Sequence, residues 1–414
     1  MNETIRQHRD TALRLLKPTE RDLEHGLALH ADALVVDAYG FSPRCAVDGD
    51  ALAAAVEQSA SDAEIQDLTE EMTMTRCVTD ARERDEYLQA WEAAGVTCIV
   101  QNAGEEGQSA LRMLKRLSRF TYVTDMLAER VSKAATPAGI TEAKAAGRHC
   151  LAFTANGVPL VEDWWSPEDE LRYVRVFLQL GIRMMHLTYN RRNMIGDGCV
   201  ETANAGLSDF GRQVIAEMNR IGMIVDCAHS GWQTSLEAAR CSTEPMVASH
   251  SVCVALNAHH RGKPDEVIRA ICDTGGYIGI CCVPAFLGGS GDINALLDHI
   301  DYVIRTFGPD HVAIGTDVAY SSSAMAEESR KVPSRGPSRK RWGNFWPADD
   351  PLFADEWRQP HQTQSLAWTN WPLFTVGMVQ RGHSDEVIRK VLAGNVLRVA
   401  TAVLDAGTFA PSGP

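Results

Sequence analysis

The stretch that decides the fold begins at residue 223 as M-I-V-D-C-A-H-S-G, and from residue 245 it reads P-M-V-A-S-H-S-V-C-V-A-L-N-A-H-H-R-G-K-P-D. Two short apolar runs in it each end in a histidine that is followed by a serine, at His229 and His250. The span 231–242 between them is long enough for a crossover helix, so the pattern is typical of a βαβ unit with two parallel strands. Because the carboxyl ends of adjacent parallel strands open into one shared mouth, we expect the two imidazoles to be neighbours.

A third apolar run, H-V-A-I-G-T-D-V, delivers Asp317 in the same manner. Two histidines and a carboxylate from three strand ends form a metal-site or acid/base constellation. A single histidine at a strand end is more often only a hydrogen-bonded polar residue. Three polar residues at the same position of three strand–helix units favour function, because active sites of α/β barrels lie at this face.

Outward from this stretch, eight apolar runs alternate with helix-length segments, which predicts a (β/α)₈ TIM barrel of the metal-dependent hydrolase type. A doubly wound open sheet is the alternative, but it would more usually show a glycine-rich loop after its first strand, and the chain has none there. The predicted strands lie at 33–37, 95–102, 149–156, 183–190, 223–229, 245–250, 277–284 and 311–317.

The sequence predicts one main domain with additions. Residues 1–30 read as a helical arm, 31–404 as the barrel and 405–414 as a tail. Residues 321–372 follow the last predicted strand and hold five of the nine tryptophans, between residues 342 and 371. This segment starts at the active face, so it is either a lid over the site or a surface excursion packed by its own aromatic side chains.

Composition limits the partners. The 414 residues carry 40 Lys and Arg against 54 Asp and Glu, a net charge of −14, which disfavours binding to nucleic acid or to anionic lipid. The polar amino terminus and the absence of a long apolar run predict a soluble protein without a membrane span. Eleven cysteines without a C-x-x-C pair read as buried thiols of a cytoplasmic protein. A homodimer is compatible with these features.

Several motifs of this chain resemble those of a known enzyme family. The spans 206–230, 248–265 and 311–317 and the run L-A-G-N-V-L-R near the C-terminus resemble the membrane (renal-type) dipeptidase family of zinc peptidases, within the amidohydrolase superfamily. The resemblance implies a (β/α)₈ barrel whose binuclear zinc site cleaves dipeptides. It also implies that His229 and His250 bind one zinc, that Asp317 is the catalytic aspartate, and that Arg261 holds the substrate carboxylate.

The other half of the family's site does not match. Where the family has Asp-x-His-x-Asp-x-Pro after its first strand, this chain has Tyr39 and Phe41 at the two ligand positions. The family's bridging glutamate corresponds to Ala155, and its substrate-binding histidine corresponds to Tyr189. Asn156, beside Ala155, is a further candidate for substrate binding.

We therefore expect zinc or another divalent metal at one ion per chain at most, or none, because phenylalanine and alanine cannot ligate a metal. Such an ion would be bound by His229 and His250 and completed by Asp317, by Tyr39 as phenolate, or by water. Cys227 lies two residues before His229 on the same strand, so it either touches the site or is a core thiol.

Three functions remain open. The first is a dipeptidase-like hydrolase of a small carboxylate-bearing amide or peptide-like substrate, in which Asp317 takes a proton, Arg261 binds the carboxylate, and Tyr189 or Tyr39 donates to the developing oxyanion. The second is a lyase, isomerase or condensing enzyme that uses its histidines and tyrosines without metal. The third is a non-catalytic binding protein on the same barrel. Metal content separates the first from the others.

Overall fold

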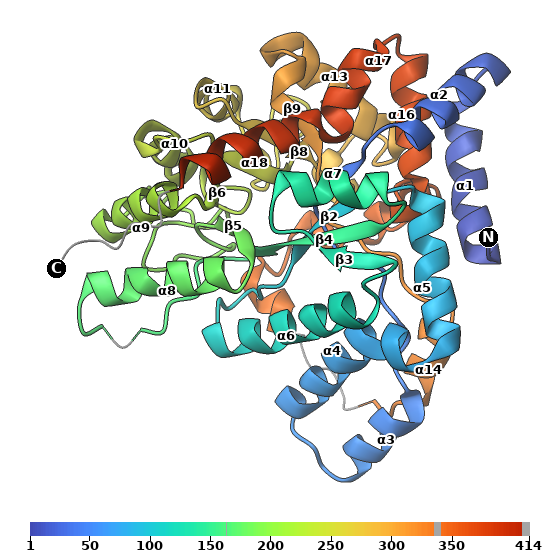
Figure 1. The fold of residues 1–414 in the computed structure, drawn as a ribbon, viewed down its shortest axis with the longest axis horizontal. Helices are drawn as coiled ribbons and strands as arrows, with labels where there is room; N and C mark the ends of the chain where they lie inside the picture. Colours follow the sequence, from blue (N-terminus) through green and yellow to red (C-terminus); the bar gives the residue numbers. More distant parts are fainter. Residues whose placement is uncertain (163, 335–340, 408–414) are drawn as a thin grey trace.

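The computed structural model describes residues 1–162, 164–334 and 341–407. Its centre is a parallel sheet with strand order β1-β2-β4-β5-β6-β7-β8-β9, and β3 pairs with β4 beside this path. Figure 1 shows the strands at the middle of the molecule with helices around them. The strands are β1 (Val36–Gly40), β2 (Cys98–Asn102), β3 (Val131–Lys133), β4 (His149–Ala155), β5 (Ile182–His186), β6 (Ile224–Asp226), β7 (Val247–Ser251), β8 (Tyr277–Ile280) and β9 (Val312–Ile314).

The sheet curls into a nearly closed barrel, because the end of β9 is bonded to β1. The backbone N–H of Asp317 donates to the carbonyl of Tyr39 at 3.1 Å, and the backbone and hydroxyl of Thr316 both donate to the Asp37 carboxylate. Every paired strand is parallel, so the predicted (β/α)₈ barrel is confirmed and the doubly wound sheet is excluded. All eight predicted strands are present within a few residues of their expected positions.

The alternation of side chains along each strand divides the core into two layers. Cys98 and Val100 of β2 belong to one buried cluster, whereas Ile99 between them belongs to the other. The cluster that contains Cys98 and Val100 includes side chains from one side of every barrel strand, so it fills the barrel interior. The cluster that contains Ile99 lies between the strands and the helices. Gly279 and Gly315 allow close packing here, since a Cβ at either would lie 1.9 or 2.0 Å from the carbonyl oxygen of Ser249.

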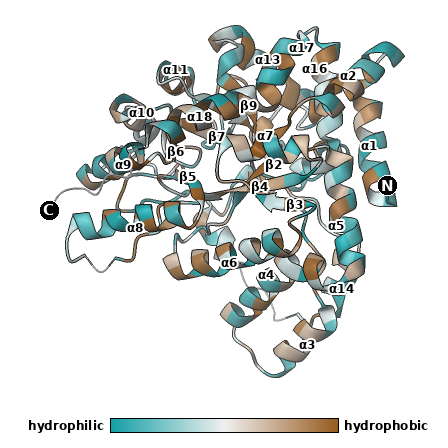
Figure 2. Ribbon diagram, in the orientation of Figure 1, coloured by the Kyte–Doolittle hydropathy of each residue, from teal (hydrophilic) through white to brown (hydrophobic). Residues whose placement is uncertain are grey.

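Helices cover the outside of the barrel, and they carry both hydrophobic and hydrophilic residues along their lengths (Figure 2). The longer ones are α1 (Glu3–Leu16), α2 (Glu20–Asp32), α3 (Gly49–Glu57), α4 (Asp62–Thr79), α5 (Ala81–Ala94), α6 (Ala110–Met126), α7 (Pro137–Ala145), α8 (Pro167–Gln179), α9 (Asp209–Ile221), α10 (Trp232–Cys241), α11 (Asp265–Asp273), α13 (Ile293–Phe307), α14 (Met325–Lys331), α16 (Trp371–Gln380) and α18 (Asn395–Ala406). Shorter segments include α12 (Pro284–Leu287), α15 (Pro360–Ser365) and α17 (Asp385–Arg389).

Local sequence signals explain several helix boundaries. α8 begins after Ser166, whose side chain accepts from the backbone of Asp169, and Pro167 occupies its first turn. The stretch 107–135 has a helical pattern but contains α6 and then the short strand β3. The region after β1 holds the three helices α3, α4 and α5.

The additions to the barrel are partly described. The arm over residues 1–30 forms α1 and α2 on either side of Pro18, and α2 packs against α16. The segment 321–372 contains residues 335–340, and the tail 405–414 contains residues 408–414, which lie outside the described part of the chain. Within the described residues, no helix has both the length and the apolar character that crossing a membrane requires.

Candidate functional site

A cavity of about 450 Å³ opens at the carboxyl ends of the barrel strands. It brings together His229, Asp317, Tyr39, Tyr189 and Asn156, which the sequence had placed at the ends of five different strands. Its lining also includes Phe41, Arg44, Asn102, Glu106, Arg116, Val283, Phe286, Trp342, Trp346 and Leu352.

His250 lies directly beside His229 at the edge of this cavity. The Nε2 atoms of the two rings are 3.0 Å apart, so the two imidazoles can share either one proton or one cation. His229 Nδ1 lies 2.6 Å from the side-chain oxygen of Asn190, and His250 Nδ1 lies 2.8 Å from Ser249 Oγ. Burial, followed by the nearby Arg261 cation, lowers the pKa of both histidines well below the ordinary value. Both rings are therefore neutral at neutral pH, which is the form that binds metals.

His186 and Asp226 extend the histidine pair into the barrel, and sequence reasoning missed both. His186 ends β5, Asp226 ends β6, and the strand register pairs them directly, with His186 Nε2 2.8 Å from Asp226 Oδ2. Burial raises the pKa of Asp226, but His186 and the donors from Ser249 outweigh it, so the net pKa lies below the ordinary value. A usable signal was present, because each residue follows an interior apolar residue, Met184 or Ile224, by two positions.

Aromatic rings occupy the space next to these imidazoles. Tyr39 stacks on His250 with ring centroids 3.7 Å apart, and Tyr189 stacks on His229 at 4.2 Å. The Tyr39 hydroxyl donates to the side-chain oxygen of Asn156 at 2.6 Å. Burial raises the pKa of both tyrosines well above the ordinary value, so both hydroxyls keep their protons and can act as donors.

Asp317 has a strained backbone at the cavity wall. Its φ of +57° lies in the left-handed region that non-glycine residues rarely adopt, and such strain clusters at functional sites. Burial raises the pKa of its carboxyl to about 6, against the opposing effects of the Arg261, His186 and Arg44 charges. The carboxylate can therefore both accept and release a proton near neutral pH, as a general base must.

Arg261 lies behind the histidines. Its side chain is fully buried and donates to the backbone carbonyls of Ala228 and of His250, the latter at 3.0 Å. These carbonyls belong to the residue before His229 and to His250 itself, so the guanidinium holds both imidazole-bearing segments in place. A purely structural arginine could instead pair with the nearby Asp265 or Glu266. Among the described residues, Arg261 forms an ion pair with neither of them.

Arg44 supplies the cation at the cavity mouth, and no sequence motif singled it out. It follows β1 in a loop that pairs with residues 320–322, and its side chain is exposed to solvent, with the guanidinium carbon 5.0 Å from the centre of the Phe41 ring. Arg116 and Glu106 line the same cavity and act electrostatically on Arg44. The mouth thus carries charges of both signs, as recognition of a zwitterion requires.

The tryptophan-rich segment divides into two parts. Trp342 donates from Nε1 to the Tyr189 hydroxyl at 3.0 Å, and Trp342 and Trp346 both line the cavity. Trp368 instead lies on the far side, where it is buried against Trp91 and donates to Asp37. The first part therefore covers the site, whereas the second part belongs to the core.

The family's two-metal arrangement does not fit these residues. Tyr39, Phe41 and Ala155 stand at three ligand positions, and Ala155 is fully buried. Within the described chain, three groups of at least three donor side chains lie within 4.8 Å of one another: His186, Asp226 and His250; His259, His260 and Asp350; and Asp48, Asp50 and Glu328. Only the first lies at the strand ends, and Asp317 belongs to none of them. Cys227 is buried in the core between strands and helices.

A parallel barrel with imidazoles and a carboxylate at its strand ends defines the class of metal-dependent hydrolase barrels. The sequence profile of the membrane dipeptidase family (peptidase family M19) matches residues 4–333, and the chain belongs to this family.

Relatives and solved structures agree with this assignment. The chain is 28% identical over 238 residues to dipeptidase tcpJ of Claviceps purpurea, which covers 56% of this chain and 47% of the relative. It is 26% identical over 302 residues to dipeptidase verJ of Clonostachys rogersoniana, covering 72% and 66%. The chain thus spans about half to two thirds of the length of these relatives.

The fold also resembles solved structures. An amidohydrolase from Pseudomonas aeruginosa matches with a TM-score of 0.66 and 24% identity, covering 92% of this chain and 99% of that one. A metallo peptidase from Rhodobacter sphaeroides, liganded with a phosphinate mimic of the dipeptide L-Ala-D-Ala, matches with a TM-score of 0.61 and 16% identity, covering 90% and 100%. At these identities the likeness concerns the fold alone.

Proposed function

We propose that this chain hydrolyses a small amide or peptide-like substrate that carries a carboxylate, with at most one divalent metal. The observation that supports this proposal is the cavity of about 450 Å³, which gathers a general-base candidate, two phenol donors and a cation around one space. A volume of this size accepts a small ligand rather than a folded protein. We also propose a cytoplasmic location, because all eleven cysteines are free thiols.

In this proposal Asp317 accepts the proton of the attacking water, since its carboxylate faces the cavity and its pKa is about 6. Tyr189 accepts a hydrogen bond from Trp342 and keeps its own proton, which it donates to the oxyanion that develops on the amide carbonyl. Tyr39 can donate to the oxyanion in the same way once its hydroxyl releases the side-chain oxygen of Asn156. A divalent metal bound by histidines at the strand ends would add Lewis-acid polarisation of the carbonyl.

The substrate carboxylate has two candidate partners. The Arg261 nitrogens that could form a fork already donate to two carbonyls, so a substrate would have to displace them. Arg44 is exposed at the mouth and lines the cavity. We therefore propose Arg44 as the carboxylate partner and Arg261 as the residue that positions His229 and His250.

Paired substrates test the proposal. Dipeptides and N-acyl amino acids are offered to the wild-type protein together with the same compounds capped as C-terminal amides, and release of the free amine is measured. We expect turnover of uncapped compounds and a kcat/KM about tenfold to a hundredfold lower for capped ones, because a charge-assisted hydrogen bond contributes roughly 1.5–3 kcal/mol. Equal turnover of capped and uncapped compounds would contradict carboxylate recognition, and no turnover of either would contradict hydrolysis.

The acid limb of the pH profile should report Asp317. A general base works as the carboxylate, and burial raises this pKa to about 6, so kcat/KM should rise with pH and level off above pH 6. The measurement is kcat/KM from pH 4.5 to 8. A limb near the ordinary carboxyl value of about 4 would instead assign the titration to an exposed acid.

A second function is supported by one observation. Tyr39 and Tyr189 stack on the two histidines, and this arrangement suits metal-free acid/base chemistry such as a lyase, isomerase or condensation step. Turnover that survives complete chelation would favour this alternative. Tight binding of a ligand without any turnover would favour a binding protein.

A further inference from the structure

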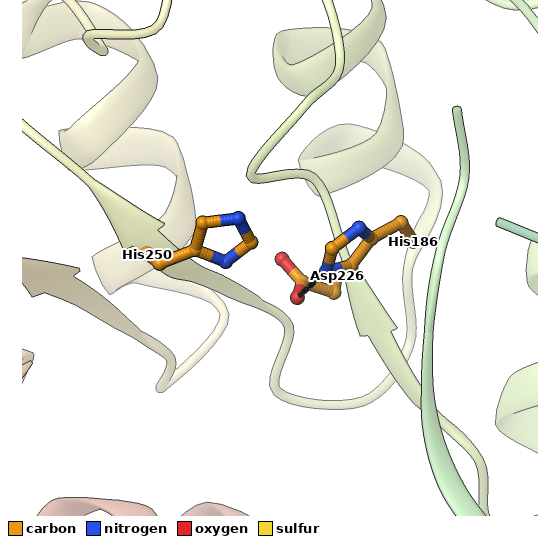
Figure 3. A group of neighbouring side chains, drawn as sticks. All are labelled: His186, Asp226 and His250. Carbon is orange, nitrogen blue, oxygen red and sulfur yellow. Dashed lines mark ion pairs between the residues drawn. The ribbon is translucent and has the colours of Figure 1, made fainter. Parts of the chain in front are cut away.

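Three consecutive barrel strands bring metal-ligating side chains close together beside the cavity. His186 comes from β5, Asp226 from β6 and His250 from β7, and one donor atom of each lies within 4.8 Å of the others. Figure 3 shows the two imidazoles and the carboxylate converging from neighbouring elements. All three residues are fully buried.

Several of these atoms have no hydrogen-bond partner in the described part of the chain. Both ring nitrogens of His186 and Oδ2 of Asp226 lack a hydrogen-bond partner, and the contact that joins them is the 2.8 Å ion pair between His186 Nε2 and Asp226 Oδ2. Buried polar atoms are nearly always satisfied in folded proteins, and an unsatisfied set that converges on one point indicates a missing ligand. Three lone-pair donors indicate that this ligand is a cation.

The surroundings hold the donors in ligand-like orientations. The other carboxylate oxygen of Asp226 accepts from the backbone N–H groups of Ala228 and Ser249, which leaves Oδ2 directed at the imidazoles. Ser249 Oγ lies 2.8 Å from Nδ1 of His250, and a hydrogen bond there leaves Nε2 of that ring as the metal-binding nitrogen. Supporting hydrogen bonds of this kind, from the far nitrogen of a histidine or the second oxygen of a carboxylate, are typical of metal ligands.

His229 lies beside this set on the cavity side but is not part of it. Its Nε2 lies 3.0 Å from His250 Nε2, whereas the donor atoms that all lie within 4.8 Å of one another belong to His186, Asp226 and His250. Two imidazoles and one carboxylate form an N₂O donor set, which with a water as the fourth ligand suits tetrahedral zinc or cobalt rather than magnesium or calcium.

We propose that this chain binds one zinc-type divalent ion through His186, Asp226 and His250, with a water molecule as the fourth ligand. This ligand set replaces the set of His229, His250 and Asp317 that the sequence suggested. This metal site adds a ligand set to the proposed single-metal hydrolase. Its role in catalysis rests on that proposed function, whereas metal binding is measured without substrate.

A second group, His259, His260 and Asp350, has one nitrogen fewer to offer a metal. His259 Nδ1 accepts from the backbone N–H of Arg261 at 3.1 Å, so in the neutral ring Nε2 carries the proton and has no lone pair for an ion. His260 Nε2 lies 3.2 Å from the Asp350 carboxylate. This group therefore serves as a contact between the covering segment and the barrel, and His260→Ala provides a matched control.

The experiment uses protein stripped with a chelator and reconstituted with Co²⁺, whose visible absorption reports tetrahedral coordination, with elemental analysis of the zinc form. We expect about one equivalent in the wild type. His186→Gln and Asp226→Asn should weaken binding at least about tenfold, since even the loss of a supporting residue typically weakens metal binding 10- to 100-fold. His260→Ala and Asp317→Asn should retain the ion.

Several results would overturn the proposal. Absence of cobalt binding by the wild type, retention of wild-type affinity by His186→Gln, or selective loss in His260→Ala or Asp317→Asn would each do so. Should the His186 and Asp226 variants fail to fold, His229→Gln decides, because the proposal requires that this variant retain the ion and the sequence-based set requires that it lose the ion. Amide hydrolysis measured separately shows whether the proposed function stands without this site.

Discussion

Asparagine in place of Asp317 is expected to lower kcat/KM for an amide substrate by about 10²- to 10⁴-fold, which is the usual contribution of a positioned general base. The side chain keeps its shape and its place at the cavity wall, but the amide cannot accept the proton of the attacking water. The acid limb near pH 6 should disappear together with the activity. Steady-state kinetics on the most active uncapped substrate provide the measurement.

The stability of the same variant separates catalysis from folding. Burial raises the folded-state pKa of Asp317 to about 6, above the unfolded value, so the carboxyl destabilises the fold progressively as the pH rises from about 4 to 6, and the penalty persists above that range. Asparagine has no charge to bury, and the melting temperature at pH 7 should be unchanged or higher. A variant that melts many degrees lower, or one that keeps wild-type kcat/KM, would show that Asp317 is structural.

The sequence was sufficient for the barrel because the strong signals are local. Each strand is a short apolar run, and the polar residue that follows it lies at the carboxyl edge of the barrel. For that reason the neighbourhood of His229 and His250 could be predicted from two histidine–serine pairs, and the structure places their Nε2 atoms 3.0 Å apart. The short strand β3 escaped prediction because three residues carry too weak a pattern against the preceding helix.

Features that depend on register or on side-chain direction could not be predicted. His186 and Asp226 lie inside apolar runs, and only the pairing of β5 with β6 shows that they face each other. Arg261 and Arg44 are both loop cations, and nothing in their sequence neighbours shows that the first turns inward to two backbone carbonyls while the second remains at the mouth. The direction of a long flexible side chain is decided by tertiary contacts.

The second large effect is expected from Arg44→Met. Methionine keeps much of the apolar length of the side chain but removes the charge, so KM for a carboxylate-bearing substrate should rise about tenfold to a hundredfold, the value of one charge-assisted interaction of roughly 1.5–3 kcal/mol. Substrates capped as amides should lose little, because they never made this contact. The measurement is the ratio of kcat/KM values for capped and uncapped substrates in the variant and in the wild type.

Arg261→Lys is the comparison that decides between the two arginines. If Arg261 positions the histidines, lysine cannot serve both carbonyls with a planar fork, so the variant should melt lower and lose kcat/KM equally for capped and uncapped substrates. If Arg261 instead binds the carboxylate, the loss should be confined to uncapped substrates, and Arg44→Met should leave their kinetics unchanged. The two roles for Arg261 therefore predict opposite patterns in the kcat/KM values of capped and uncapped substrates. Loss of a contact with the substrate carboxylate affects only uncapped substrates, whereas loss of a contact with the protein backbone affects both.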